Sequence, residues 1–197
     1  MQYEKLKALI GKIKEQGRGG KREAVFNDLY PYQKYLLMSL NPSPETDKTK
    51  NADEKHSGFE ERVIALFFFG SDNKEALKKI RANYPRFKDA FFKNVYWTHY
   101  SKERRADNPD SFWANEDLEE EIKLAEPILI ITFGQLPADF LLGKGNLKNR
   151  VNKISTWNGI QVICCLHPSR NWNMQVRPEY KFDETWSLIR SKIKIDY

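Results

Sequence analysis

Two apolar segments near opposite ends of the chain are each followed by a polar side chain that could take part in chemistry. Residues 35–40 lead into Asn41, residues 162–166 lead into His167, and a proline follows each of these two residues. The Asn41 amide can orient a water molecule but is too weak a base to deprotonate it. The His167 imidazole can donate a hydrogen bond to an oxygen that gains negative charge. The alternatives are that Asn41 belongs to an Asn-Pro turn and that backbone groups satisfy the hydrogen bonds of His167. Because both apolar segments end in the same pattern, we favour one composite site.

The other residue types exclude several common kinds of site. The chain has three histidines and two cysteines, and their spacing matches no metal-binding motif. Cys164 and Cys165 are adjacent in an apolar run, which is typical of buried strand residues. No glycine-rich dinucleotide motif, phosphate-binding loop or Gly-x-Ser-x-Gly motif occurs. We therefore expect neither a metal nor a cofactor.

Composition and charge favour a nucleic acid as the partner. The chain of 197 residues has the size of one domain, so we expect a single domain that spans residues 1–197. The formal net charge of +6 and the 13% of aromatic residues suit contacts with phosphates and bases, although charge alone does not decide this. The apolar runs are too short to cross a membrane, and residues 1–15 have no signal-peptide centre. We expect a monomer without a membrane partner, in the cytoplasm or wherever the DNA lies, in the nucleoid or the nucleus.

The elements that must position these side chains alternate between strands and helices. Apolar runs predict strands at residues 34–40, 94–99, 128–133 and 160–166, with helices at 2–15, 59–69, 72–82, 116–125, 135–142 and 178–193. Tyr84-Pro85 is expected to break a helix, and residues 151–158 receive no assignment. This order predicts an α/β fold, a three-layer α/β/α sandwich around a central four-stranded parallel sheet. Ligands bind such sheets at the carboxyl ends of the strands, where Asn41, His99, Gly134 and His167 all fall.

Four short motifs between about Leu36 and Trp186 resemble segments of the uracil-DNA glycosylase superfamily, in the same order. Residues 39–44 (Ser-Leu-Asn-Pro-Ser-Pro) are similar to the first motif of the mismatch-specific and single-strand-selective branches, and residues 166–169 (Leu-His-Pro-Ser) to the second motif. Residues 95–102 look like the Thr-Asn-x-x-Lys segment of the iron–sulfur branch. Residues 127–134 resemble the strand of that branch that begins at a proline and ends at a glycine.

The resemblance implies a monofunctional DNA glycosylase of base excision repair, which flips a deaminated base, uracil before others, out of DNA and hydrolyses its N-glycosidic bond. In such an enzyme Asn41 would position the attacking water and His167 would stabilise the departing base anion. His99 would read the edge of the base, and Phe59 would stack on it. The substrate-binding residues would also include Ser39, Leu40 and Pro42. Contacts with the DNA strand are expected from Ser43, Ser169, Arg170, Asn171 and Trp172.

Four residues depart from the superfamily pattern. Ser39 and Ser43 stand where the first motif has glycines. Glu103 stands where the iron–sulfur branch has a cysteine, so no cluster is expected. His99 stands where the family places an Asn, and an imidazole offers its donor and acceptor in another geometry. Two alternatives therefore stay open: a glycosylase for another base, such as hypoxanthine or xanthine, and a non-catalytic nucleic-acid-binding protein on the same fold.

Overall fold

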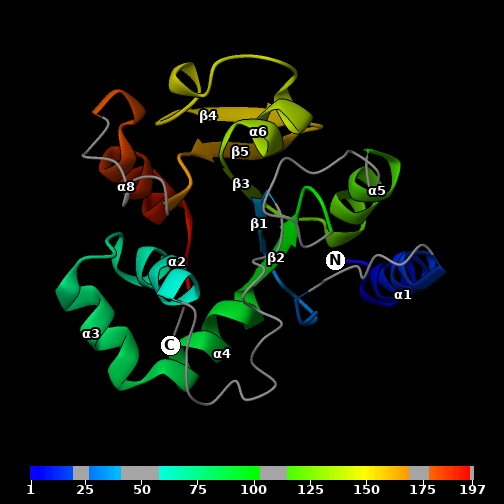
Figure 1. The fold of residues 1–197 in the computed structure, drawn as a ribbon, viewed down its shortest axis with the longest axis horizontal. Coiled ribbons are helices and arrows are strands. Elements are labelled where there is room, and N and C mark those ends of the chain that lie inside the picture. Colours follow the sequence, from blue (N-terminus) through cyan, green and yellow to red (C-terminus); the bar gives the residue numbers. More distant parts are fainter. Residues whose placement is uncertain (20–26, 41–57, 103–114, 169–177, 196–197) are drawn as a thin grey trace.

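A five-stranded sheet with helices on both faces forms the centre of the fold (Figure 1). The computed structural model describes residues 1–19, 27–40, 58–102, 115–168 and 178–195. Neighbouring strands follow the order β2-β1-β3-β5-β4. The strands are β1 (Tyr35–Ser39), β2 (Val95–His99), β3 (Leu129–Phe133), β4 (Ile154–Trp157) and β5 (Ile160–Cys165).

Four of these strands are the ones that the apolar runs predict, and all four are parallel. β1, β2 and β3 are buried along their whole length, as expected of strands covered on both faces. The prediction of a four-stranded, wholly parallel sheet is wrong, because β4 adds a fifth strand that pairs with β5 in the antiparallel direction. Asn158 and Gly159 connect this hairpin with φ angles of 48° and 82°, the positive values that a tight two-residue turn requires.

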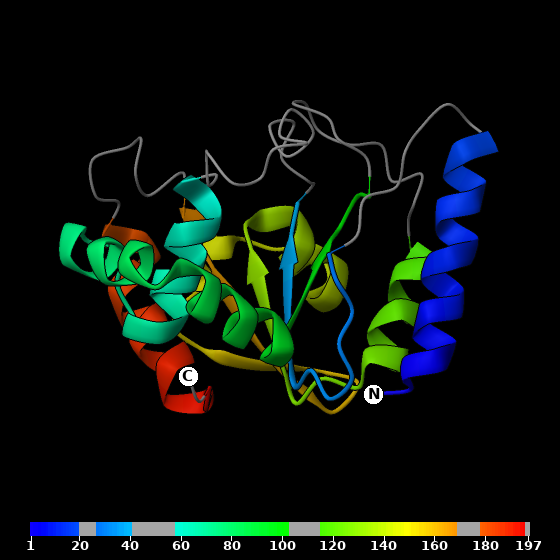
Figure 2. The ribbon, with the colours of Figure 1, turned by 90° about the horizontal axis from the view of Figure 1, so that it is seen from below.

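Helices lie on both faces of the sheet. Figures 1 and 2 show α1, α5 and α6 on one side, and α2, α3, α4 and α8 on the other. The helices are α1 (Tyr3–Gly19), α2 (Gly58–Phe69), α3 (Lys74–Ala82), α4 (Tyr84–Asn94), α5 (Asn115–Ala125), α6 (Gln135–Leu142) and α8 (Phe182–Lys192), with short 3-10 helices at Leu147–Asn149 and Pro178–Tyr180. The α/β class is therefore confirmed, whereas a sandwich specific to the glycosylase superfamily stays a prediction.

Three helices differ from the predicted ones. α1 continues as far as Gly19, beyond its predicted end. The side chain of Asn73 caps α3, whereas Asp72, the first residue of the predicted helix, lies before α3 and pairs with Arg62 at 3.0 Å. α4 was not predicted, because Pro85 indicates a helix break. In fact Pro85 stands in the first turn of α4, where its missing N–H would have no helical partner anyway.

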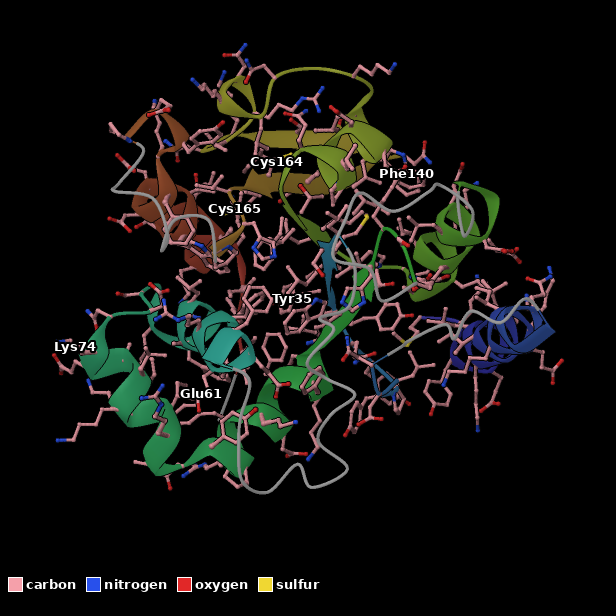
Figure 3. All side chains as sticks on the ribbon, in the orientation of Figure 1. Tyr35, Glu61, Lys74, Phe140, Cys164 and Cys165 are labelled. Carbon is pink, nitrogen blue, oxygen red and sulfur yellow. The ribbon has the colours of Figure 1, made fainter. Side chains whose placement is uncertain are left out.

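Side chains that are adjacent along a strand face different helix layers, because successive residues of a strand point to opposite faces. On β5, where Figure 3 labels both cysteines, Cys165 lies against Trp186 of α8, and Cys164 lies near Asp139 of α6. Both cysteines are buried and unbridged, as the apolar run predicts. Burial raises the pKa of each thiol. The same alternation decides which side chains of β2 reach the candidate site.

Candidate functional site at the carboxyl ends of the strands

The carboxyl ends of β1 and β2 lie side by side and bring Ser39 next to His99. These two residues are partners in the parallel register. The pairing continues beyond the strands, because the Tyr100 N–H donates to the Ser39 carbonyl and the Ser101 N–H to the Leu40 carbonyl, each at 2.8 Å. On its other side β1 pairs with β3, so the strand order reverses there, and open α/β sheets bind ligands at such a point. Leu40 is therefore held at the expected place for a ligand.

Five rings form a continuous row across this end of the sheet, which we call the ring row: Phe133, His167, Phe59, Trp97 and His99. His167 stacks on Phe59, with ring centroids 4.8 Å apart and planes 3° apart, and the Phe133 ring meets it edge-on at 5.8 Å. Trp97 lies 5.8 Å from Phe59 and 6.3 Å from His99. Because β2 and β5 are three strand steps apart, about 14 Å, the two histidines reach this region from opposite sides.

Phe59 reaches the ring row from the first turn of α2. This helix is apolar almost all round, and its residues 63–67 are fully buried, as expected of a helix enclosed between a sheet and other helices. Phe67 packs edge-on against both Phe91 of α4 and Trp186 of α8, with centroids 5.0 and 5.4 Å apart. These contacts fix α2 against the sheet, and the fixed helix places Phe59 over the strand ends.

Ser39 and Trp97 are joined by a buried hydrogen bond. The Trp97 Nε1–H donates to the Ser39 Oγ at 3.0 Å, and the serine is only 2% exposed. The indole is thereby fixed between Phe59 and His99. Ser39 thus has an observed structural role, whereas its predicted contact with a substrate stays a prediction.

The imidazole of His99 is buried and neutral. Its residue is 7% exposed, and burial, followed by the charge of Lys102, lowers its pKa to about 3. Nδ1 is buried and has no hydrogen-bond partner in the described part of the chain. A neutral imidazole carries one donor and one acceptor nitrogen, so one of these groups is left unsatisfied by the protein.

Lys102 and Glu121 form a buried ion pair on the opposite face of β2. The Lys102 Nζ and Glu121 Oε2 atoms are 2.7 Å apart, and the side chains are 2% and 0% exposed. Lys102 also donates to the Thr98 hydroxyl and, at 2.9 Å, to the carbonyl of His99, and the Tyr96 hydroxyl donates to Glu121 at 2.6 Å. Burial lowers the pKa of Lys102, and Glu121 opposes that shift. The pair therefore anchors the main chain at His99 to α5.

The structure brings together five of the residues predicted for the site. Ser39, Leu40, Phe59, His99 and His167 all lie at the carboxyl end of the sheet. The remaining predicted residues, which would position the water or contact the base and the DNA strand, lie outside the described ranges: Asn41, Pro42, Ser43, Ser169, Arg170, Asn171 and Trp172.

Sequence reasoning did not find Trp97, Lys102 or Glu121. Trp97 stands two positions before His99, so the period of a strand already places both side chains on the same face. Lys102 belongs to the segment that resembles Thr-Asn-x-x-Lys, and that match was the available signal for it. No signal indicates Glu121, because it is one of several acidic residues of a charged helix.

The described residues contain no group of three or more histidine, cysteine or carboxylate side chains that could hold a metal ion. None of the helices within those ranges is long and apolar enough to cross a membrane. No protein-family model matches the chain, and a search of curated proteins finds no match either.

Proposed function

We propose that this chain is a monofunctional DNA glycosylase that removes a deaminated base, uracil before others, from DNA. The observation that carries the proposal is the stack of His167 on Phe59 at the carboxyl end of the sheet, in one ring row with His99. A flat apolar ring with one imidazole stacked on it, and a second imidazole on the far side of Trp97, suits a flat heterocycle with hydrogen-bonding edges. The net charge of +6 and the motifs similar to those of the uracil-DNA glycosylase superfamily add support.

The nucleotide leaves the double helix in this proposal, because its glycosidic bond cannot be reached within the stack of bases. The base then lies on the Phe59 ring. His167 covers one face of that ring at 4.8 Å, whereas a base inserted between two rings needs about 7 Å, the thickness of two van der Waals layers. His167 therefore moves away from Phe59 as the base enters, and it turns an N–H toward an oxygen of the base.

The reaction is a hydrolysis that needs no covalent intermediate with the protein. Asn41, which directly follows the anchored Leu40, holds a water molecule against C1′ of the sugar. The water oxygen forms a bond to C1′ and loses one proton to solvent, the bond from C1′ to the base nitrogen breaks, and the electron pair of that bond leaves with the base. A hydrogen bond from His167 stabilises the base anion, which then takes a proton from solvent. The sugar–phosphate chain stays intact.

Single-turnover cleavage of an oligonucleotide with one uracil tests the proposal. We expect abasic sites, which alkali converts into strand breaks, and no breaks without alkali. His167→Phe keeps a ring that can stack on Phe59 but cannot donate a hydrogen bond, so we expect a rate loss of about a hundredfold or more. Asn41→Ala should have a loss of similar size. Thr156→Ala, on the exposed side of the edge strand β4, is the matched control and should keep the rate of the wild type.

The outcomes separate the proposal from its alternatives. A folded protein that releases no deaminated base contradicts the proposal. Salt-dependent DNA binding without release, unchanged by Asn41→Ala, supports a non-catalytic nucleic-acid-binding protein instead.

A glycosylase for another base is the second candidate, and the buried neutral His99 favours it. An asparagine amide can match the oxygen and the ring N–H of uracil together, whereas one imidazole edge cannot make both contacts. Oligonucleotides with uracil, hypoxanthine or xanthine separate the two candidates. His99→Asn should increase uracil release if this residue limits it.

A further inference from the structure

The helices α3 and α4 concentrate positive charge on one side of the sheet. Residues 74–94 contain seven lysine or arginine residues and two acidic residues. The helices on the opposite side, α1, α5 and α6, together contain six basic and eight acidic residues (Figure 1). A polyanion is therefore attracted to the side of the sheet that α3 and α4 cover.

Three basic side chains lie along one flank of α3. Lys74, Lys78 and Arg81 are spaced by four and three residues, which places them on the same side of the helix. All three residues are exposed, and Figure 3 labels Lys74 at the outer edge of the protein. The row covers seven helical steps, about 10 Å. Phosphates of one DNA strand follow each other about every 3.4 Å along the helix axis, so the row matches a stretch of about three phosphates.

The corner between α3 and α4 lies beside the ring row. The Arg81 Nε–H donates to the Glu61 carboxylate at 2.7 Å, and the Lys88 ammonium lies 3.0 Å from the Glu60 carboxylate. Both acids belong to the first turn of α2, directly after Phe59. These contacts hold the end of α3 and the start of α4 next to Phe59, so the row on α3 leads up to the candidate site.

Several cations of these helices have no partner inside the described part of the protein. Lys74, Lys78 and Arg86, which stands in the first turn of α4, form no ion pair with another described residue. Lys79 and Lys93, in contrast, pair with acids of their own helices at 3.3 and 2.7 Å. An exposed cation without an internal partner can neutralise a phosphate and release the counterion of that phosphate.

We infer that Lys74, Lys78, Arg81 and Arg86 form a basic surface that binds the phosphates of the DNA strand next to the flipped nucleotide. The inference rests on the proposed function, because Phe59 marks the place where that nucleotide would enter. The strand leads from the corner beside Phe59 along α3, on the side of the sheet opposite α5. Contacts with phosphates position the DNA but read no bases, so this surface serves every sequence equally.

Two double variants with the same change in net charge test the inference. Lys74→Gln/Lys78→Gln removes two cations from the basic surface, and Lys5→Gln/Lys7→Gln removes two exposed cations from α1 on the other side of the sheet. Glutamine and lysine have similar helix propensities, so both variants should fold. The probe is a duplex of about 20 base pairs with one uncleavable 2′-fluorinated uracil nucleotide. Fluorescence anisotropy measures its affinity between about 50 and 200 mM salt.

Each phosphate contact contributes about 0.9 to the slope of log affinity against log salt concentration. We therefore expect Lys74→Gln/Lys78→Gln to reduce this slope by about 1.8, so that its affinity falls about tenfold less than that of the wild type over this salt range. Lys5→Gln/Lys7→Gln should keep the slope of the wild type. Lys74→Arg/Lys78→Arg retains both charges and should also keep that slope.

An unchanged slope in Lys74→Gln/Lys78→Gln overturns the inference. An equal reduction in Lys5→Gln/Lys7→Gln also overturns it, because the effect would then come from net charge alone. The failure of the proposed function gives a different result. A protein with the expected slopes that releases no deaminated base refutes the glycosylase and supports the basic surface as a DNA contact. A protein that releases uracil with the same slope in all variants refutes only the basic surface.

Discussion

Removing the charge of Lys102 should destabilise the protein far more than removing an exposed lysine from the same part of the fold. The Lys102 and Glu121 side chains are almost wholly buried, and their charged atoms are 2.7 Å apart. Lys102→Met would leave the Glu121 carboxylate buried without its cation. Breaking a buried pair in this way costs about 3–5 kcal/mol, which for a chain of this size lowers the Tm by about 6–20 °C.

Two matched variants show whether the buried charge causes this loss. Lys102→Met/Glu121→Gln removes both charges and keeps an amide oxygen that can accept from Tyr96, so we expect a stability within about 1 kcal/mol of the wild type. Lys123→Met breaks an exposed pair with Glu119 on α5, also at 2.7 Å, and should cost about 0.5 kcal/mol or less.

Urea unfolding followed by circular dichroism measures all three variants. Two results contradict this prediction: Lys102→Met costs no more stability than Lys123→Met, or the double variant is as unstable as Lys102→Met. In the first case the buried ion pair does not hold this region, and in the second case the loss comes from packing and not from an unpaired charge.

Three other predictions follow from the ring row and the core. The folded-state pKa of His99, about 3, lies below the ordinary value of 6.5, so the unfolded chain binds more protons between these pH values. Stability should therefore rise by about 1 kcal/mol per pH unit from pH 4 to 6, and His99→Phe should flatten this rise in urea unfolding at several pH values. Phe59→Leu removes the ring that His167 covers, so binding of uncleavable uracil DNA should weaken about tenfold in fluorescence anisotropy, the size of one lost base stack. Burial raises the pKa of both Cys164 and Cys165, so a thiol reagent at neutral pH should modify neither in the folded protein and both in urea.

The four parallel strands could be predicted because each is a short apolar run that ends in polar residues. β4 lacks that signal, because it lies at the edge of the sheet and its residues alternate between exposed and half-buried. The Asn158-Gly159 pair was the available indication of its hairpin, since that dipeptide favours a tight turn between antiparallel strands. For α4, the helix-breaking tendency of Pro85 hid a helix whose first turn tolerates a proline.

The candidate site could be predicted as far as topology determines it. Parallel strands bring their carboxyl ends to one edge of the sheet, so the shared location of His99 and Ser39 follows from the order of the elements. The stack of Phe59 on His167 depends on how α2 packs, and the partner of Lys102 depends on which face of α5 meets β2. Those are contacts between distant segments, and no local pattern specifies them.

His99 and His167 would have different roles in the proposed reaction, because their surroundings differ. The His99 imidazole is already neutral at neutral pH, and its buried position disfavours the protonated form. It can therefore donate a hydrogen bond but cannot supply a full positive charge next to the departing base. His167 is half-buried and stacks on the ring where the base would lie. In the proposed reaction His167 is therefore the better placed of the two to stabilise the base anion, whereas His99 offers a neutral hydrogen-bonding group.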